Sequence, residues 1–148
     1  MDKNVEEFVK QMLYDKNIVD VIRLIDEIAD SEILHLYAYN YNWDNGFEIP
    51  KKIIHKDCCQ LSTALMMFYA ADGIRYLQDK SKVNNLKEWS TFIKELYNKI
   101  INNGFIEGAI KFNPPLSKVQ IFKIKKVINT KEEAFLKEIG TNDLNVYL

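Results

Sequence analysis

The sequence predicts an all-α fold, a compact single-domain helical bundle over residues 1–148 around a buried central helix at about 58–71. Three observations support this prediction. Apolar residues recur at helical spacing along most of the chain, residue pairs typical of helix starts precede several of these runs, and one run is apolar on nearly every side. A chain of 148 residues with 47% hydrophobic and 28% charged residues is also long enough to bury one self-sufficient core.

The N-terminal third contains three predicted helices. Asn4 with Glu7 fits a variant of the capping box at the start of a helix at about 5–14, and a helix at about 17–29 follows. Asp30 or Ser31 then caps the third helix. The apolar positions that define the three buried faces are Val5, Phe8, Val9 and Met12, then Ile18, Val21, Ile22, Ile25 and Ile28, then Ile33, Leu34, Tyr37 and Ala38.

Residues 40–50 break the helical pattern. Asn45-Gly46 is a turn signal, because both residue types tolerate positive φ. Pro50 disfavours helix at the residue before it and can itself open a short helix near 50–55.

The central helix is the most apolar segment of the chain. Asp57 with Gln60 resembles its cap, and Asp72-Gly73 marks its end. A helix that is apolar nearly all round is typical of a segment buried on every side. We therefore expect 58–71 to lie in the middle of the bundle.

Three further helices are expected in the C-terminal half, where the first ends at Asn103-Gly104 and the last at Gly140. Their start signals are Asn85 with Glu88, Ser117 with Gln120, and Thr130 with Glu133. The helix after Ser117 carries Val119, Phe122 and Val127 as apolar positions. Lys118, Lys123, Lys125 and Lys126 lie on the polar side of Val119, Ile121, Phe122 and Ile124. Residues 105–112 fit either a short strand or an extended arm.

The composition excludes a disordered chain, a collagen-like chain and a disulfide scaffold. The two cysteines, Cys58 and Cys59, are adjacent and cannot bridge distant parts of the chain, which favours a reducing, cytoplasmic location. Acidic residues interrupt the first twenty positions, and the longest apolar run, 64–71, is far shorter than the ~20 residues of a membrane helix. We expect neither a secretory signal nor membrane binding.

Residues that could carry chemistry are few. His55, Asp57, Cys58 and Cys59 lie close in sequence, but a zinc site normally takes four ligands and the chain has no second Cys/His pair. A catalytic Cys–His pair would join one of these cysteines to His35 or His55, whereas a small buried thiol is the ordinary role of such a cysteine. The lysines after Ser117 are explained by a solvated helix face. We expect no metal, no cofactor, no catalytic residue and no nucleic-acid partner.

The charge is unevenly spread. Residues 1–48 hold eleven acidic and four basic residues, a net charge of −7, and residues 49–148 carry +6. The acidic third either faces a basic partner or pairs with the basic remainder of the chain. The candidate partner-binding residues are Asp26, Glu27, Asp30, Asp44 and Glu48.

Aromatic and acidic residues alternate between positions 37 and 49. If exposed, the segment would be an anchor patch for a protein partner; if buried, Trp43 and Phe47 would plug the bundle while nearby polar side chains satisfy backbone donors. We favour the structural role for Trp43 and Phe47. For Asp44 and Glu48 both roles stay open.

The same segment carries a family resemblance. Asn40-Tyr41-Asn42-Trp43-Asp44-Asn45-Gly46-Phe47-Glu48-Ile49-Pro50, with Cys59, Thr63-Ala64-Leu65, Phe68-Tyr69 and Ala71-Asp72-Gly73, resembles the bacterial domain-of-unknown-function family 4274. A later piece, 114–121, resembles the C-terminal part of that family, so the resemblance covers roughly 30–125. Asn45 replaces an Asp of the family pattern, which removes a charge and weakens any metal-binding role. The motif residues with an expected structural role are Asn42, Trp43, Asn45, Gly46, Phe47, Pro50, Cys59, Asp72 and Gly73.

The resemblance transfers no catalytic residues, because the family has no established activity. Its small, α-rich bacterial members resemble the immunity proteins of polymorphic toxin systems, which implies a non-catalytic cytoplasmic protein that binds and neutralises a cognate toxin domain. Two alternatives stay open: a small enzyme that uses the carboxylates of residues 43–48, or a homo-oligomeric scaffold. The sequence does not determine the oligomeric state.

Overall fold

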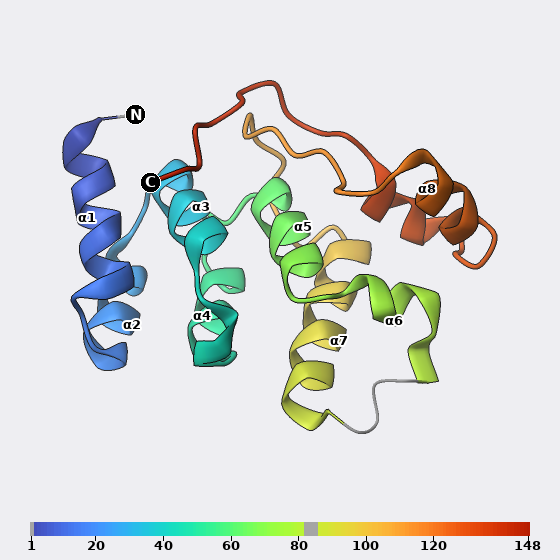
Figure 1. Cartoon of the computed structure of the whole chain (residues 1–148), viewed down its shortest axis with the longest axis horizontal. Helices are drawn as coiled ribbons and strands as arrows, with labels where there is room; N and C mark the ends of the chain where they lie inside the picture. Colours follow the sequence, from blue (N-terminus) through green and yellow to red (C-terminus); the bar gives the residue numbers. More distant parts are fainter. Residues whose placement is uncertain (1, 82–85) are drawn as a thin grey trace.

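The computed structural model describes residues 2–81 and 86–148, and over these residues the fold is all-α, as predicted (Figure 1). The helices, including the 3-10 helices η1 and η3, are α1 (Lys3–Tyr14), α2 (Ile18–Glu27), α3 (Ser31–Asn40), η1 (Trp43–Asn45), α4 (Glu48–Ile54), α5 (Leu61–Ala70), α6 (Ile74–Gln78), α7 (Lys87–Ile101), α8 (Lys118–Lys125) and η3 (Lys131–Leu136). The extended chain within these ranges forms isolated β-bridges but no sheet. Nor does any helix in the described part of the chain have the length and apolar character needed to cross a membrane.

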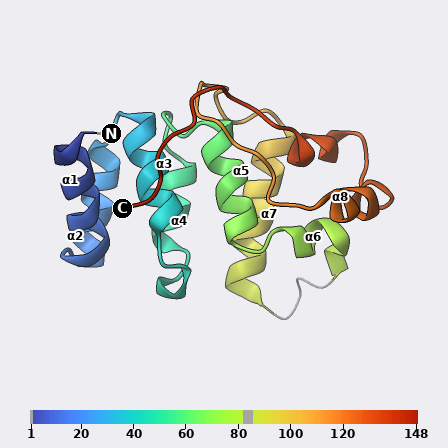
Figure 2. The same ribbon diagram turned by 45° about the horizontal axis from the view of Figure 1, so that its top comes forward.

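The helices follow one another across the molecule. In Figures 1 and 2, α1 and α2 form one end, α3 and α4 come next, α5 and α7 lie in the middle, and α6 and α8 form the other end. Contacts join α1 to α3, α2 to α4, α3 to α5, and α5 to α7. The C-terminal segment returns from η3 across the top of α5 and ends beside α3 (Figure 1). Residues from both ends of the sequence therefore meet near α3.

The predicted central helix is α5. It packs between α3 and α7, and Ser62–Phe68 is buried along its whole length. The helix starts later than predicted, at Leu61, and its N-cap Gln60 makes no side-chain cap bond, so the expected cap by Asp57 was wrong. The Leu61 N–H is satisfied instead by the carbonyl of Ile106, at 2.8 Å. A tertiary contact thus replaces the local cap.

The N-terminal helices lie where the periodicity placed them, with one corrected cap. Asp2, not Asn4, caps α1: its carboxylate accepts from the Asn4 N–H at 2.8 Å, so the helix begins at Lys3. Asn17 caps α2 through the Asp20 N–H, and Asp30 caps α3 through the Glu32 N–H.

Helix α4 begins before Pro50 rather than at it. Its first residue is Glu48, so Ile49 is helical, against the expectation drawn from the proline. Pro50 is the third residue of α4, where the backbone N–H that proline lacks would have no partner inside the helix.

Helix α5 ends in a Schellman motif. The Gly73 N–H donates to the Phe68 carbonyl at 2.7 Å, and the Asp72 N–H donates to the Tyr69 carbonyl at 3.0 Å. Asp72, not the glycine, takes the left-handed conformation, with φ of 61°. The corresponding bonds at the end of α7 run from Gly104 N–H to Lys99 O (2.8 Å) and from Asn103 N–H to Ile100 O (3.2 Å).

The C-terminal half departs most from the expectations. The capping box of Ser117 with Gln120 is confirmed, but Val119 and Phe122 face solvent and Ile124 is the buried residue of α8. Residues 105–112 form an extended arm with isolated bridges. The last helix, η3, ends at Leu136 rather than at Gly140, and Thr130 makes no side-chain cap bond. The expected cap Asn85 lies outside the described residues, and α7 begins at Lys87.

Candidate functional site

The motif around η1 is a capped turn. The Asn42 side chain accepts from the Asp44 N–H at 3.0 Å, which starts η1, and the Gly46 N–H bonds the Trp43 carbonyl at 3.2 Å, which ends it. Gly46 has φ of 94° and ψ of −168°, a conformation that essentially only glycine adopts. The Tyr41 hydroxyl donates to the Gly46 carbonyl at 2.7 Å. These bonds fix the chain between α3 and α4.

The aromatic residues of the motif attach this turn to α7. Trp43 and Phe47 are half-buried, and both rings pack against buried Phe92, with centroids 5.8 Å and 5.3 Å away. Trp43 also meets the Tyr41 ring edge-on at 5.4 Å. Burial and the nearby charge of Glu48 raise the pKa of Tyr41 to about 12, so its hydroxyl stays protonated and can donate. Pairs of this kind hold rings in fixed geometry.

A groove of about 340 Å³ opens beside the turn, and we call it the η1 groove. Tyr14, Ile18 and Val21 line it from α1 and α2, and Asn42 and Asn45 line it from the motif. Tyr14 is 73% exposed and Ile18 43%, so its rim contains solvent-exposed apolar surface.

Two acidic residues directly precede lining residues of the η1 groove: Asp44 comes before Asn45, and Glu48 before Ile49, while Lys16 itself lines the groove. Asp44 belongs to η1 and Glu48 is the first residue of α4; both are exposed. Neither side chain has a hydrogen-bond or ion-pair partner among the described residues. They are therefore free to meet a cation from outside.

The three other candidate acids lie at the far end of α2. Asp26 pairs with Lys52 of α4 at 3.2 Å, Asp30 caps α3, and exposed Glu27 has no partner among the described residues. The C-terminal ends of α2 and α4 therefore lie together, joined by this ion pair. Their N-terminal ends lie together at the η1 groove, which Ile18 and Val21 of α2 and Ile49 of α4 line. The structure therefore divides the five predicted residues between two places instead of one patch.

The residues considered for nucleophilic chemistry make other contacts. Burial raises the pKa of the Cys59 thiol to about 12. His35 is buried and its Nδ1 bonds the Thr63 hydroxyl at 2.8 Å, while exposed His55 bonds Glu95. In residues 2–81 and 86–148, no three His, Cys, Asp or Glu side chains come together to hold a metal ion.

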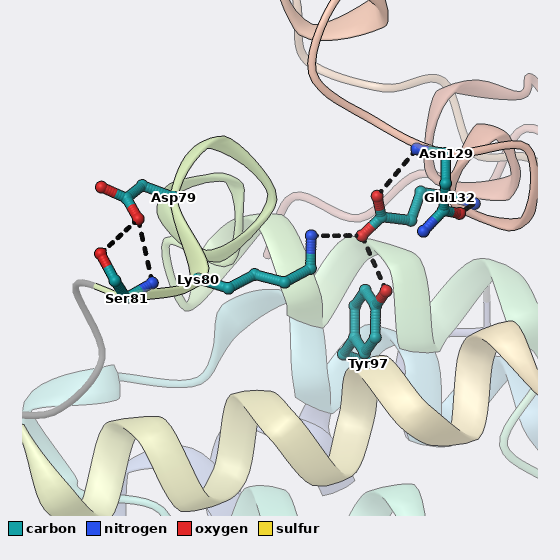
Figure 3. Close-up of polar contacts among 6 residues, drawn as sticks. All are labelled: Asp79, Lys80, Ser81, Tyr97, Asn129 and Glu132. Atoms are coloured by element: carbon teal, nitrogen blue, oxygen red, sulfur yellow. Dashed lines mark hydrogen bonds and ion pairs between the residues drawn. The ribbon is translucent and has the colours of Figure 1, made fainter.

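Sequence reasoning missed a buried polar cluster around Glu132, shown in Figure 3. Glu132 is only 1% exposed, and it accepts from Lys80 at 2.7 Å, from the Tyr97 hydroxyl at 2.7 Å and from the Asn129 N–H at 3.0 Å. Burial alone would raise the pKa of Glu132, but these donors outweigh it and hold the pKa below its ordinary value. Lys80 follows α6 and Tyr97 rises from α7, so the cluster ties η3 to both (Figure 3).

A sequence signal for this cluster existed. The Glu132 N–H donates to the Asn129 side chain at 3.0 Å, and the Glu132 carboxylate accepts from the Asn129 N–H, which is the reciprocal pattern of a capping box. Shifting the expected pair from Thr130 with Glu133 by one residue would have placed it correctly.

Comparison with known proteins links part of the chain to a protein family. A family model described as "Domain of unknown function (DUF4274)" matches residues 29–101. No curated protein and no solved structure matches the chain. The matched segment contains the η1 motif and the end of α5 but stops short of residues 114–121, where the resemblance was expected to continue. The comparison thus supports placing residues 29–101, from just before α3 to the end of α7, in the domain-of-unknown-function family DUF4274.

Proposed function

We propose that this protein is a cytoplasmic, non-catalytic binding protein of the immunity type, which neutralises a cognate bacterial toxin domain by covering a basic surface on it. The observation that carries the proposal is the η1 groove, whose lining includes exposed Tyr14 and Ile18. Asp44 and Glu48, which have no hydrogen-bond or ion-pair partner among the described residues, directly precede its lining residues Asn45 and Ile49.

The composition of this surface suits protein recognition. Large apolar side chains supply most of the energy of an interface, and charges around them speed association with a partner of opposite charge. Val19, 73% exposed, follows Ile18 and extends the apolar surface along α2. The net charge of −7 on residues 1–48 would add a long-range attraction for a basic partner.

The surface is also rigid before binding. Trp43 and Phe47 are fixed against Phe92, and the Gly46 carbonyl is held by Tyr41, so Asp44 and Glu48 project from a turn with little freedom. A surface that needs no ordering loses less entropy when it binds. The motif residues thereby hold the backbone that carries Asp44 and Glu48 in place.

The test is the association rate with the native partner. Tagged protein is used to isolate the partner from the native host, and the partner is identified by mass spectrometry. The double variant Asp44→Lys with Glu48→Lys is then compared with the wild type by stopped-flow fluorescence at two salt concentrations. We expect association to slow by about tenfold or more at low salt and by less at high salt, because salt screens exposed charges.

The matched control reverses two exposed acids elsewhere, Glu133→Lys with Glu138→Lys. It makes the same change in net charge at the C-terminal end of the chain and should slow association much less. Circular dichroism checks that both variants keep their helical content. Equal rates for the two double variants, or a partner whose contact surface is acidic, would contradict the proposal.

A further inference from the structure

A second cavity lies on a different part of the molecule. It has a volume of about 590 Å³ and opens between α3, α5 and the extended segments 111–115 and 143–146. Figure 1 shows the C-terminal segment passing over α5 to reach α3. The cavity shares no lining residue with the η1 groove. Its size lies in the range of small-molecule sites.

The His35 side chain is the main indication that this cavity binds a ligand. His35 lines the cavity although it is only 4% exposed. Its Nδ1 bonds Thr63, and its Nε2 has no partner among the described residues and is not sealed from solvent. The Thr63 hydroxyl has no other hydrogen-bond partner there, so we assign its hydrogen to Nδ1. The Nε2 of His35 is then an N–H donor that only a ligand or water can satisfy.

Two residues of opposite charge, Lys111 and Asp143, also line the cavity. The Lys111 N–H donates to the Asn142 carbonyl at 2.8 Å in a parallel bridge between two extended segments. The bridge places Lys111 beside Asp143 on the neighbouring segment. Both residues line the cavity, yet neither has an ion-pair partner among the described residues. Because Lys111 and Asp143 are neighbours across this bridge and both line the cavity, a molecule that carries a negative and a positive charge can contact both residues.

Apart from Asn113 and Tyr39, the rest of the lining is mainly apolar. Met66 comes from α5, Phe112 and Leu144 come from the extended segments, and the Tyr69 ring stacks on Phe112 at 5.9 Å. The Tyr69 hydroxyl is already satisfied by the Phe135 carbonyl at 2.6 Å, so Tyr69 offers the cavity its ring rather than a donor.

We propose that this cavity binds a small zwitterion with an apolar side chain, of the class of the apolar α-amino acids. Lys111 and the Nε2–H of His35 are the donors for its carboxylate, Asp143 is the acceptor for its ammonium group, and Met66 and Phe112 contact its side chain. Because burial lowers the pKa of His35 to about 4, the imidazole is neutral at pH 7 and acts as a donor rather than as a second cation.

The test uses three probes with the same phenyl group: L-phenylalanine, 3-phenylpropanoate without the amine, and 2-phenylethylamine without the carboxylate. Binding to the full chain is measured from chemical-shift changes in ¹H–¹⁵N spectra, including the ring nitrogens of His35. We expect L-phenylalanine to bind about tenfold more tightly than either truncated probe, since charge-assisted hydrogen bonds are the strong ones.

Substitutions at the two exposed residues test the contribution of each charge separately. Lys111→Met should weaken binding of L-phenylalanine and 3-phenylpropanoate but not of 2-phenylethylamine. Asp143→Asn should weaken binding of L-phenylalanine and 2-phenylethylamine but not of 3-phenylpropanoate. Lys118→Met on α8, outside the cavity, should change nothing. Three results would overturn the proposal: no binding at a probe concentration of about 10 mM, equal affinity for the three probes, or affinity unchanged by both cavity variants. A dissociation constant of about 10 mM corresponds to a binding free energy of only about −3 kcal/mol.

Discussion

Two glycines of the motif are required for different physical reasons. At Gly46 a β-carbon would meet no atom within 4 Å, but the backbone has φ of 94°. At Gly73 the backbone is ordinary, with φ of −64°, but a β-carbon would lie 2.6 Å from the carbonyl oxygen of Phe68. The first position therefore excludes other residues by conformation and the second by contact.

Alanine at either position should destabilise the fold by about 1–3 kcal/mol, measured as the free energy of unfolding in urea. D-alanine, introduced by chemical ligation, distinguishes the two causes. At position 46 it should restore stability, because a D-residue favours positive φ; at position 73 it should not. Asp44→Ala is the neighbouring control and should stay within about 0.5 kcal/mol of the wild type. A Gly46→Ala variant as stable as the control would show that the turn relaxes without cost.

At the scale of the element, periodicity predicted more than local start signals did. The apolar spacing located α1, α2, α3, α5 and α7, because each of these helices buries one face or all of its surface. Start signals were less specific, because Asp2 and Asn4 are both good caps and only the backbone decides which one is used. Where a tertiary contact serves as the cap, as at Leu61, no local signal exists.

The candidate sites were predictable only in part. The aromatic and acidic pattern of residues 37–49 singled out Asp44 and Glu48. Their separation from Asp26 follows from the packing of α2 on α4, which the sequence does not show. The cavity of the further inference joins residues as far apart as His35 and Asp143. No local pattern relates them, because the C-terminal segment returns across the whole bundle (Figure 1).

Helix α8 offers a test of its corrected orientation. Phe122 is 63% exposed and Ile124 is 2% exposed, although both are apolar. We expect Ile124→Ala to lower the free energy of unfolding by about 2–5 kcal/mol, as a buried truncation does, and Phe122→Ala to change it by about 0.5 kcal/mol or less. Thermal and urea unfolding of both variants measure the difference. A larger loss for Phe122→Ala would mean that α8 is rotated from the observed orientation.

At the scale of the whole molecule, the fold extends beyond the family segment on both sides. Helices α1 and α2 cover α3 and α4, and their residues Val9 and Ile25 are fully buried. On the other side, Phe135 of η3 packs on Phe68 of α5 with ring centroids 4.5 Å apart. The segment 29–101 therefore shares its core with both flanks, and stability is a property of the whole chain.

Two buried groups, His35 and Glu132, make this stability depend on pH. Burial lowers the pKa of His35 from 6.5 to about 4, so unfolding takes up a proton between these values. The contribution of His35 is complete above pH 6.5 and is lost as the pH falls toward 4, with a slope of up to about 1.4 kcal/mol per pH unit. The pKa of Glu132 is also lowered, from 4.5, so its contribution is complete above that value and is lost only as the pH falls below it.

The region between pH 7.5 and 4.5 therefore reports mainly on His35. The free energy of unfolding should fall by about 2–3 kcal/mol over this range in the wild type, measured by urea denaturation. His35→Gln keeps an amide that can bond Thr63 but does not titrate, so its curve should be flatter by about that amount. Contributions from groups that the substitution leaves unchanged are common to both proteins and cancel in the comparison. Parallel curves for the two proteins would show that folding does not lower the pKa of His35.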